Sequence, residues 1–432
     1  MSSLGDPAGA GVALFELLTE LFPLHRSITG HGVRQTLARL SRHIPLAIHE
    51  VPSGTRVFDW TVPDEWNVRE AWIADATGRR VVDIARSNLH LVHYSTPVRA
   101  RLSLAELRPH LFSLPEAPEL IPYRTSYYTP TWGFCLADRD LTALAEGEYE
   151  VCIDATLAPG SLTYGEYVLP GDSDDEVLVS THICHPSLAN DNLSGIVVAT
   201  ALAQQLAARA PRRYGYRFVF VPGTIGSITW LARNEAGVER IRHGLVVAGL
   251  GDASAFSYKK SRRGDAEIDR LVPRVLQDMG APHAVRDFSP YGYDERQYCS
   301  PGFDLPVGCL MRTPHGGYRE YHTSADDLTF VHAERLDESL RLVLAVVDAL
   351  EANRAYVSQN QKCEPHLGRR GLYASLGGVG RPAEELALLW TLNLADGRHT
   401  VLEIAERSGM PFAAIDRAAR TLSEHGLLKE AV

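Results

Sequence analysis

The sequence predicts an α/β fold with a mixed or parallel sheet covered by helices, a small β-rich insertion and a C-terminal winged helix-turn-helix. Three observations lead to this prediction. Short apolar runs alternate with helical patterns in the middle of the chain, an aromatic stretch with many short strand-like runs interrupts them, and the last part has helix–turn–helix spacing. Alternating buried strands and helices are typical of sheets with helices on both faces.

The middle of the chain supplies the strands and helices of the α/β domain. Apolar runs at 176–180, 217–221 and 245–249 fit short buried strands, and residues 195–206 fit a helix. Two further helical patterns lie in the first 50 residues. In such sheets ligands bind beyond the carboxyl ends of the strands, so the segments that follow each strand are the candidates for chemistry.

Changes in composition divide the chain into three parts. Residues 51–144 contain short strand-like runs broken by Gly, Pro and Asp, with many Trp and Tyr, and fit an inserted β-rich domain. Segments 1–50 and 145–358 together form the α/β domain. The remainder, 359–432, begins with a Gly-, Pro- and Arg-rich linker and continues as the winged helix.

Charge and composition exclude several classes of function. The 432 residues carry a net charge of −10, and the chain has no run of about 18 apolar residues, which argues against membrane insertion. Six cysteines lack paired spacing and the start lacks a leader pattern, so we expect a cytoplasmic protein. Acids outnumber bases after residue 383, which argues against nucleic-acid binding and favours homo-oligomer contacts through the winged helix or the insertion.

The strongest chemical signal follows the first α/β strand. His182, His185 and Asp191 lie within ten residues, directly before a predicted helix. Imidazole and carboxylate groups are the ligands that zinc prefers, although Asp191 could instead cap the helix. Carboxylates and histidines also follow the later strands, at Asp252 and in the segments 293–297 and 321–327. Because strand ends converge at one edge of a sheet, a shared metal site is favoured over simple capping.

With its other motifs, the chain resembles the bacterial aminopeptidase-like zinc proteins. The matching blocks lie at 59–66, 87–90, 128–135, 184–187, 189–195, 294–297, 300–302 and 321–327. The resemblance implies the fold of the co-catalytic zinc aminopeptidases, an inserted β domain and a winged-helix tail. It also implies a zinc cofactor, as one or two ions.

Carried over residue by residue, the resemblance implies four metal ligands: His185, Asp191, Asp252 and His322. We prefer His185 to His182 because the block around it is the more regular one. The remaining candidates would contact the metal ligands or the substrate, and they are His182, Arg124, Tyr293 and Tyr321. Cys184 is interpreted as buried packing.

One departure from the family pattern affects the mechanism. Gly223 stands where relatives carry a glutamate that binds a second metal or acts near the attacking water. The nearest carboxylates that could serve as base are Asp294 and Glu295, unless they form a structural ion pair with Arg296. The predicted function is therefore a zinc-dependent amide hydrolase acting on a peptide or a small N-acyl metabolite. The alternative is a one-metal member that catalyses transfer or cyclisation, or that binds a ligand.

Overall fold

The computed structural model describes residues 9–372 and 383–431, and these divide into two compact units. The first comprises Met1–Ile268 and Ala284–Leu340, and the second comprises Asp269–His283 and Arg341–Val432. The residues 1–8, part of the expected leader-free start, and 373–382, part of the expected linker, lie outside the described residues.

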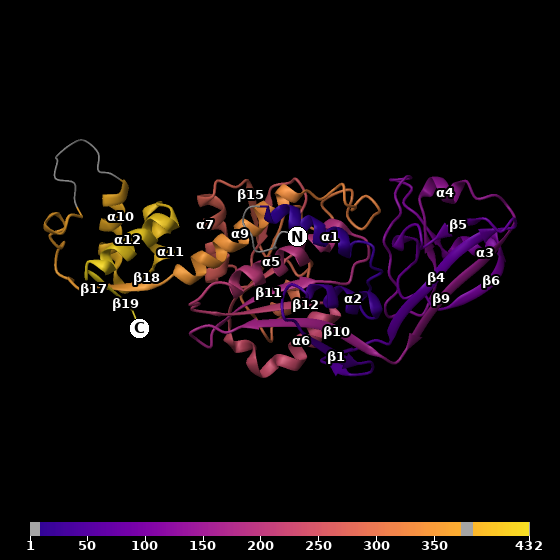
Figure 1. Ribbon diagram of the computed structural model, residues 1–432, viewed down its shortest axis with the longest axis horizontal. Helices are drawn as coiled ribbons and strands as arrows, with labels where there is room; N and C mark the ends of the chain where they lie inside the picture. The colour runs from indigo at the N-terminus through magenta and orange to yellow at the C-terminus, as the bar shows by residue number, and fades with distance from the viewer. Residues whose placement is uncertain (1–8, 373–382, 432) are drawn as a thin grey trace. The chain divides into compact units, whose positions relative to one another are not determined.

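A large mixed sheet forms the centre of the first unit (Figure 1). The strands β12, β11, β13 and β16 are parallel, and antiparallel strands flank them on both sides. The mixed sheet predicted from the sequence is therefore confirmed. In spatial order the strands are β1 (Ala47–Pro52), β10 (Ser161–Leu169), β12 (Gly215–Val221), β11 (Glu176–His182), β13 (Ile241–Val247), β16 (Val307–Met311), β14 (Phe256–Lys259) and β15 (His283–Arg286).

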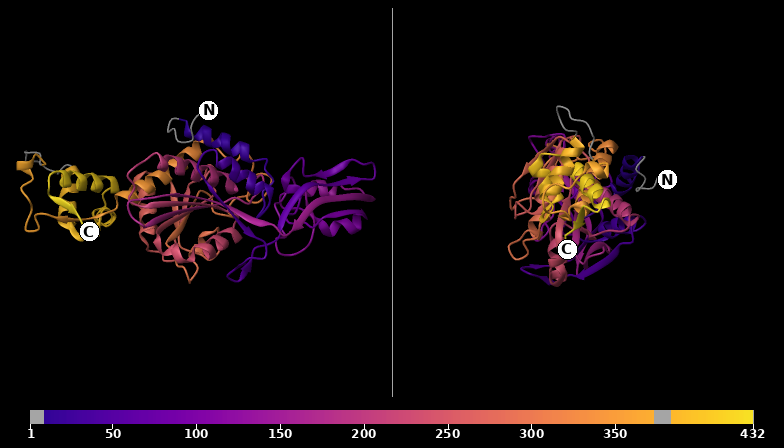
Figure 2. Two further views of the ribbon diagram at one scale, coloured as in Figure 1. Left: turned by 60° about the horizontal axis from the view of Figure 1, so that its bottom comes forward. Right: turned by 90° about the vertical axis from the view of Figure 1, so that its left-hand side faces the viewer.

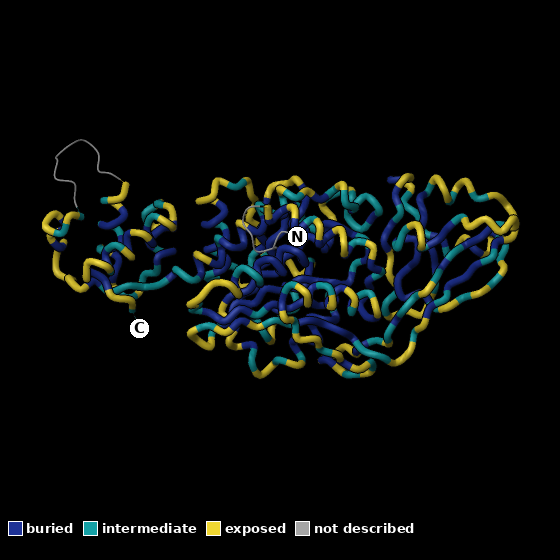
Figure 3. The backbone as a smooth tube through the Cα atoms, in the orientation of Figure 1, coloured by how far each residue is buried: buried dark blue, intermediate teal, exposed yellow. Residues whose placement is uncertain are grey.

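Helices cover both faces of this sheet, as Figures 1 and 2 show. Helix α5 packs on β11, β12 and β13 together with α1, whereas α6 packs on β10 and β12 from the other side. Every residue of β11 is buried, and Figure 3 shows the central strands largely in the colour of buried residues. The helices of the first unit include α1 (Ala10–Leu21), α2 (His31–Leu40), α5 (Gly195–Ala207), α6 (Ile225–Asn234) and α8 (Glu295–Tyr298), whereas most of α7 (Glu267–Asp278) and of α9 (Ala333–Ala352) belongs to the second unit.

The β-rich insertion forms a second, four-stranded antiparallel sheet of order β5-β4-β9-β6. Its strands are β4 (Glu65–Asp75), β5 (Arg80–Asp83), β6 (Val98–Ser103) and β9 (Glu148–Ala158), with the hairpin β2 (Arg56–Val57) and β3 (Trp60–Thr61) preceding them. The sequence analysis ended the insertion at 144, whereas β9 continues its sheet to Ala158. Strand β9 then leads through Gly160 into β10 of the main sheet, so no linker marks this boundary.

The second unit contains the winged helix-turn-helix that the sequence predicts. Its helices are α10 (Ala383–Leu394), α11 (Val401–Ser408) and α12 (Phe412–Glu424), and its sheet consists of β17 (Ala355–Ser358), β18 (Asp396–Thr400) and β19 (Leu428–Glu430). A capping box between Thr400 and Glu403 begins α11, and Gly409 ends it at a φ of 69°. Among the described residues, no helix combines the length and the apolar character that crossing a membrane requires.

Candidate metal centre and active site

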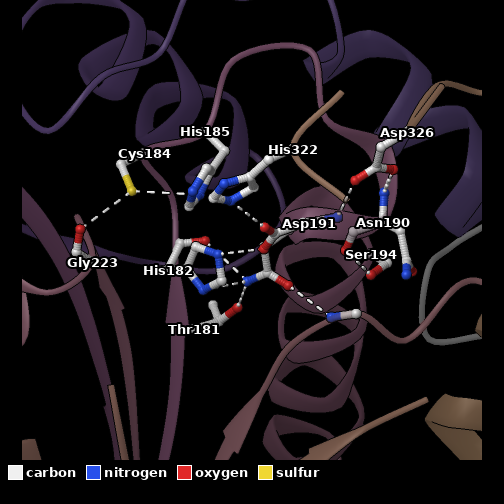
Figure 4. Close-up of polar contacts among 12 residues, drawn as sticks. Thr181, His182, Cys184, His185, Asn190, Asp191, Ser194, Gly223, His322 and Asp326 are labelled. Atoms are coloured by element: carbon white, nitrogen blue, oxygen red, sulfur yellow. Dashed lines mark hydrogen bonds and ion pairs between the residues drawn. The ribbon is translucent and has the colours of Figure 1, made fainter. Parts of the chain in front are cut away.

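The centre of the site is built where β11 ends. His182 is the last residue of that strand, and the wide turn Ala189–Ser194 leads from the following loop into α5. Asp191 lies in this turn with a fully buried side chain, and its Oδ1 is 2.8 Å from Nε2 of His182 (Figure 4). The strand end and the turn therefore bring an imidazole and a carboxylate together.

Two more histidines complete this group, which we call the metal cluster: His182, His185, Asp191 and His322. His182, His185 and Asp191 offer ligand atoms that all lie within 4.8 Å of one another. On the other side of the carboxylate, Nε2 of His322 lies 3.0 Å from Oδ2 of Asp191 (Figure 4). The ring centroids of His185 and His322 are 5.1 Å apart. One buried carboxylate thus lies among three imidazoles.

The protonation states of Asp191 and His185 suit a metal ion. Burial acts to raise the pKa of Asp191, but His185 and its neighbours hold that pKa well below its usual value. Burial lowers the pKa of His185 well below its usual value, which keeps the imidazole neutral. An ionised carboxylate and neutral imidazoles are the forms that bind zinc.

The backbone of the turn is fixed from behind by Asp326. Its carboxylate accepts hydrogen bonds from the amides of Asn190, at 2.6 Å, and of Asp191, at 2.9 Å. The sequence analysis quoted the segment that contains Asp326 but gave this residue no role. The interaction joins positions 135 residues apart, so spacing along the chain could not have revealed it.

The structure does not bring Asp252 into the metal cluster, contrary to the ligand assignment made from the resemblance. Its Oδ2 accepts a hydrogen bond from Nδ2 of Asn190 at 3.0 Å, and its Oδ1 accepts from the amide of Ser254 and from Oγ1 of Thr313. Strand β13 ends at Val247, so Asp252 lies too far along the chain to sit at the strand end.

A second feature of the site is the space beside Gly223, which follows β12. A Cβ at this position would lie 3.1 Å from Cβ of His182 and 3.5 Å from each carboxylate oxygen of Asp294. The buried Asp294 carboxylate, from the start of α8, therefore occupies the neighbourhood into which a longer side chain at 223 would extend. The carboxyl group that Gly223 lacks is present there, supplied by another segment.

The buried carboxylate of Asp294 has few hydrogen-bond partners. Its Oδ1 accepts a hydrogen bond from Oγ of Ser227 at 2.9 Å, whereas its Oδ2 has no hydrogen-bond partner. Burial is the main cause that raises the pKa of Asp294 to about 6. A carboxyl group with such a pKa can exchange a proton near neutral pH.

Glu295, the other predicted base, points elsewhere. Its Oε1 forms a buried ion pair with Nζ of Lys259 at 2.7 Å, and the same Nζ donates to the carbonyl oxygen of Tyr291. The expected alternative partner was Arg296, but the structure gives Lys259. This ion pair anchors the loop that carries Asp294.

A pocket of about 110 Å³ opens beside the metal cluster, and Tyr293 and Tyr321 line it. Tyr293 stacks on His182 at 5.1 Å between ring centroids, and Tyr321 stacks on His322 at 3.9 Å. Arg124 is exposed and its guanidinium lies over the ring of Phe112, so the structure does not bring it to the pocket. The residues that line the pocket are His182, His185, Gly223, Thr224, Gly292, Tyr293, Asp294 and Tyr321.

Tyr123, which precedes Arg124 in the chain, contacts the metal cluster. The buried ring of Tyr123 makes edge contacts with His185 and with His322, at 5.2 and 5.1 Å between centroids. Tyr123 belongs to the insertion that the sequence showed to be rich in Trp and Tyr. The sequence could not show which of these rings faces the metal cluster.

Comparison with known proteins identifies the family. A family model described as a domain of unknown function, DUF4910, matches residues 15–353, and a winged helix-turn-helix model matches residues 354–430. The chain belongs to the DUF4910 family. A Clostridium acetobutylicum relative is 48% identical over 97% of this chain and 96% of its own, and is named as a candidate polysaccharide-biosynthesis protein with an aminopeptidase-like domain.

Solved structures place the DUF4910 fold among the aminopeptidases. The crystal structure of a candidate peptidase from Clostridium acetobutylicum is 46% identical, covers 98% of this chain and 97% of its own, and has a TM-score of 0.93. A zinc aminopeptidase from Bacillus subtilis is 14% identical over 80% of this chain and 95% of its own, with a TM-score of 0.59. The aminopeptidase-like fold expected from the resemblance is therefore confirmed.

Proposed function

We propose that this DUF4910 protein is a metal-dependent amide hydrolase that removes a small acyl group from the nitrogen of an amino sugar. The observation that carries the proposal is the pairing of the metal cluster with a buried carboxylate, Asp294, across one pocket. A family fold shared with zinc aminopeptidases supports hydrolytic chemistry, and the residues of this chain define how it would proceed.

We infer that zinc is held by Asp191 together with the imidazoles of His182, His185 and His322. The donor set is nitrogen and carboxylate oxygen, which zinc prefers. Among the described residues, Oδ2 of Asp191 and Nε2 of His322 contact each other at 3.0 Å and make no further hydrogen bond, so an ion could take both atoms as ligands. A bound zinc ion supplies Lewis acidity toward a carbonyl oxygen. Because Asp252 is committed to other partners, we expect one ion in each chain.

Asp294 is proposed as the general base. In hydrolysis, water adds to the amide carbonyl carbon, the C–N bond breaks, and the amine leaves with a proton. The free Oδ2 of Asp294 can accept the proton of that water and return it to the amine. The hydrogen bond from Ser227 and the loop anchored by Lys259 and Glu295 hold this carboxylate at the pocket.

The pocket favours a neutral N-acyl group over the free amino end of a peptide. Asp294 is the one carboxylate among its lining residues apart from the metal cluster, and no Lys or Arg lines it. If Asp294 acts as base, no second carboxylate is left to bind an α-ammonium group. The Clostridium acetobutylicum relative named for polysaccharide biosynthesis supports an N-acylated amino sugar as the substrate of this hydrolysis.

Metal analysis followed by a substrate comparison tests the proposal. We expect about one zinc per purified full-length chain, and zinc-dependent release of acetate from N-acetylated amino sugars but not of amino acids from aminoacyl amides. Asp294→Asn separates the base from the metal site, because this variant should retain zinc and lose turnover. A protein that binds zinc but hydrolyses neither class would favour the transfer, cyclisation or binding alternatives.

A further inference from the structure

A second hollow in the first unit, of about 240 Å³, lies outside the metal pocket. The hairpin of β2 and β3 forms one wall, and α6 and α8 with the loop after α8 form the other. We call this hollow the aromatic groove. The members that matter for its chemistry are Phe58, Asp59, Trp60, Gln297, Ser300 and Phe303.

Two aromatic rings of the groove are exposed to solvent. Phe58 is 44% exposed and Trp60 is 47% exposed, and Tyr128, which is 50% exposed, lies against Trp60 at 5.4 Å between ring centroids. Phe58 pairs with Phe303 at 5.7 Å. Phe58 also adopts a φ of 56°, a left-handed conformation that is costly for a bulky residue. A group of exposed rings in contact with one another is a candidate binding surface.

The groove lies along the same two helices that border the metal pocket. Thr224, just before α6, lines the pocket, and Ile228 and Leu231 within α6 line the groove. A helical rise of about 1.5 Å per residue separates Thr224 from Ile228 by roughly 6 Å. Likewise Asp294, at the start of α8, faces the pocket, and Gln297 of that helix faces the groove.

A chain of tyrosines makes the same connection on the side of the insertion. Tyr123 contacts His185 of the metal cluster, and its hydroxyl lies 2.8 Å from that of Tyr127. Tyr128 follows directly and pairs with Trp60 of the groove. The groove and the metal pocket are therefore bordered by the same two helices and by neighbouring residues of the insertion.

The groups of the groove match the surface of a sugar ring. A pyranose presents a C–H face that stacks on aromatic rings and hydroxyl edges that require hydrogen bonds. Phe58, Trp60 and Phe303 supply the rings, while Asp59, Gln297 and Ser300 supply a carboxylate, an amide and a hydroxyl. No Lys or Arg lines the groove, which disfavours a polyanion, and a wholly apolar partner would have to desolvate Asp59.

We propose that the aromatic groove binds a saccharide residue of the same chain whose N-acyl sugar occupies the metal pocket. This inference rests on the proposed function and specifies its substrate as an oligosaccharide rather than a single sugar. The groove residues take no part in bond breaking. They raise affinity for longer chains.

Binding of the β-1,4-linked N-acetylglucosamine tetramer and of the monomer, measured by calorimetry on the full-length zinc-loaded protein, tests the inference. We expect the tetramer to bind at least about tenfold more tightly than the monomer, and Trp60→Ala and Phe58→Ala to abolish this difference. Both side chains are exposed, so we expect melting temperatures close to that of the parent. Leu386→Ala, which removes another apolar side chain that is 42% exposed, is the matched control and should leave the difference intact.

Equal affinity for tetramer and monomer, or no binding of either, would overturn the inference, as would a preference that survives Trp60→Ala. If Trp60→Ala instead converts a dimer to a monomer in sedimentation experiments, the groove is a contact between two copies and not a saccharide site. Tetramer binding that depends on Trp60, without release of acetate, would uphold the groove and reject the proposed hydrolysis. The two proposals can thus fail separately.

Discussion

Asp191 in the metal cluster and Asp294 in the lining of the adjoining pocket are both buried carboxylates, yet their surroundings drive their pKa values in opposite directions. Asp191 lies among imidazoles that hold its pKa well below the usual value, whereas burial raises the pKa of Asp294 to about 6. Asp294 has one hydroxyl donor, from Ser227, and an oxygen without a partner. The comparison teaches that local compensation, and not burial alone, separates a carboxylate suited to a metal from one suited to carry a proton.

Removing each carboxylate in turn tests most strongly whether the two have different roles. We expect Asp191→Ala to weaken zinc binding by more than about 100-fold, because loss of an outer partner of a ligand alone costs about 10–100-fold. Zinc content after dialysis against a chelator measures the effect. His182→Ala should lose zinc as well, since its imidazole contacts Asp191 directly. Retention of zinc by His182→Ala and its loss from His185→Ala would restore the preference drawn from the sequence.

Asp294→Asn tests the other side of the comparison. The amide keeps the shape of the carboxyl group but cannot accept the proton, so we expect kcat to fall by about 10²–10⁴-fold with zinc content unchanged. Single-turnover kinetics on an N-acetylated amino sugar, with zinc measured on the same sample, gives both quantities. A variant that loses zinc together with activity would assign Asp294 to the metal.

The two carboxylates also differ in how far the sequence could predict them. His182, His185 and Asp191 follow one strand within ten residues, so the sequence indicated a metal site from local spacing. Strand β11 runs to His182, two residues beyond the predicted strand end, and both His182 and His185 lie beside Asp191. Asp294 was predicted as a base, but its position beside Gly223 depends on a loop 71 positions further along the chain.

The fold was predicted better than the site for a similar reason. Buried strands, helical periodicity and the winged-helix spacing are local patterns that survive folding. The site depends instead on contacts between residues that are far apart in the sequence. These are the hydrogen bond of Asp252 with Asn190, the hydrogen bonds of Asp326 with the turn, and the contact of Tyr123 with His185. No spacing rule shows whether a carboxylate in the segment after a strand, such as Asp252, turns toward the metal cluster or toward Asn190 and Thr313.

A glutamate at position 223 would remove the contrast between the two carboxylates. From sequence alone, Gly223→Glu could be expected to restore a second metal site. In the structure its Cβ would crowd His182 and its carboxylate would meet that of Asp294. We therefore expect unchanged zinc stoichiometry, lower activity, and a loss of stability of about 1–3 kcal/mol from overpacking, visible in thermal unfolding.

The double variant Gly223→Glu/Asp294→Ala distinguishes crowding from a general intolerance of side chains at 223. It removes the competing carboxylate and makes room for the new one. We expect it to be more stable than Gly223→Glu alone and to regain part of the activity that Asp294→Ala loses. Zinc rising toward two ions per chain in either variant would contradict the single-ion site.

A buried histidine away from the metal cluster gives the smallest effect and separates burial from local compensation. Burial is the main cause that lowers the pKa of His243 to about 4, and Arg213 and Arg242 lower it further. The carboxylate of Glu267 lies 3.7 Å from its Nε2, too far for a hydrogen bond, and Asp175 opposes the shift only in part. His243 thus resembles Asp294, since burial outweighs the opposite charges nearby.

The sign of the pH effect follows from this lowered pKa. In the unfolded chain an imidazole titrates near pH 6.5, so between pH 6.5 and 4 the unfolded state binds the proton more readily than the folded state. His243 therefore contributes its full stability above pH 6.5 and loses it progressively as the pH falls toward 4. Between pH 7 and 5 the free energy of unfolding should fall by about 2 kcal/mol on this account, and the fall should be smaller by that amount in His243→Gln. Urea unfolding of both proteins at the two pH values measures this change in the free energy of unfolding. The contributions of the other histidines cancel when the two proteins are compared. An equal fall in both proteins would mean that Glu267 compensates the protonated ring, which would place His243 with Asp191 and not with Asp294.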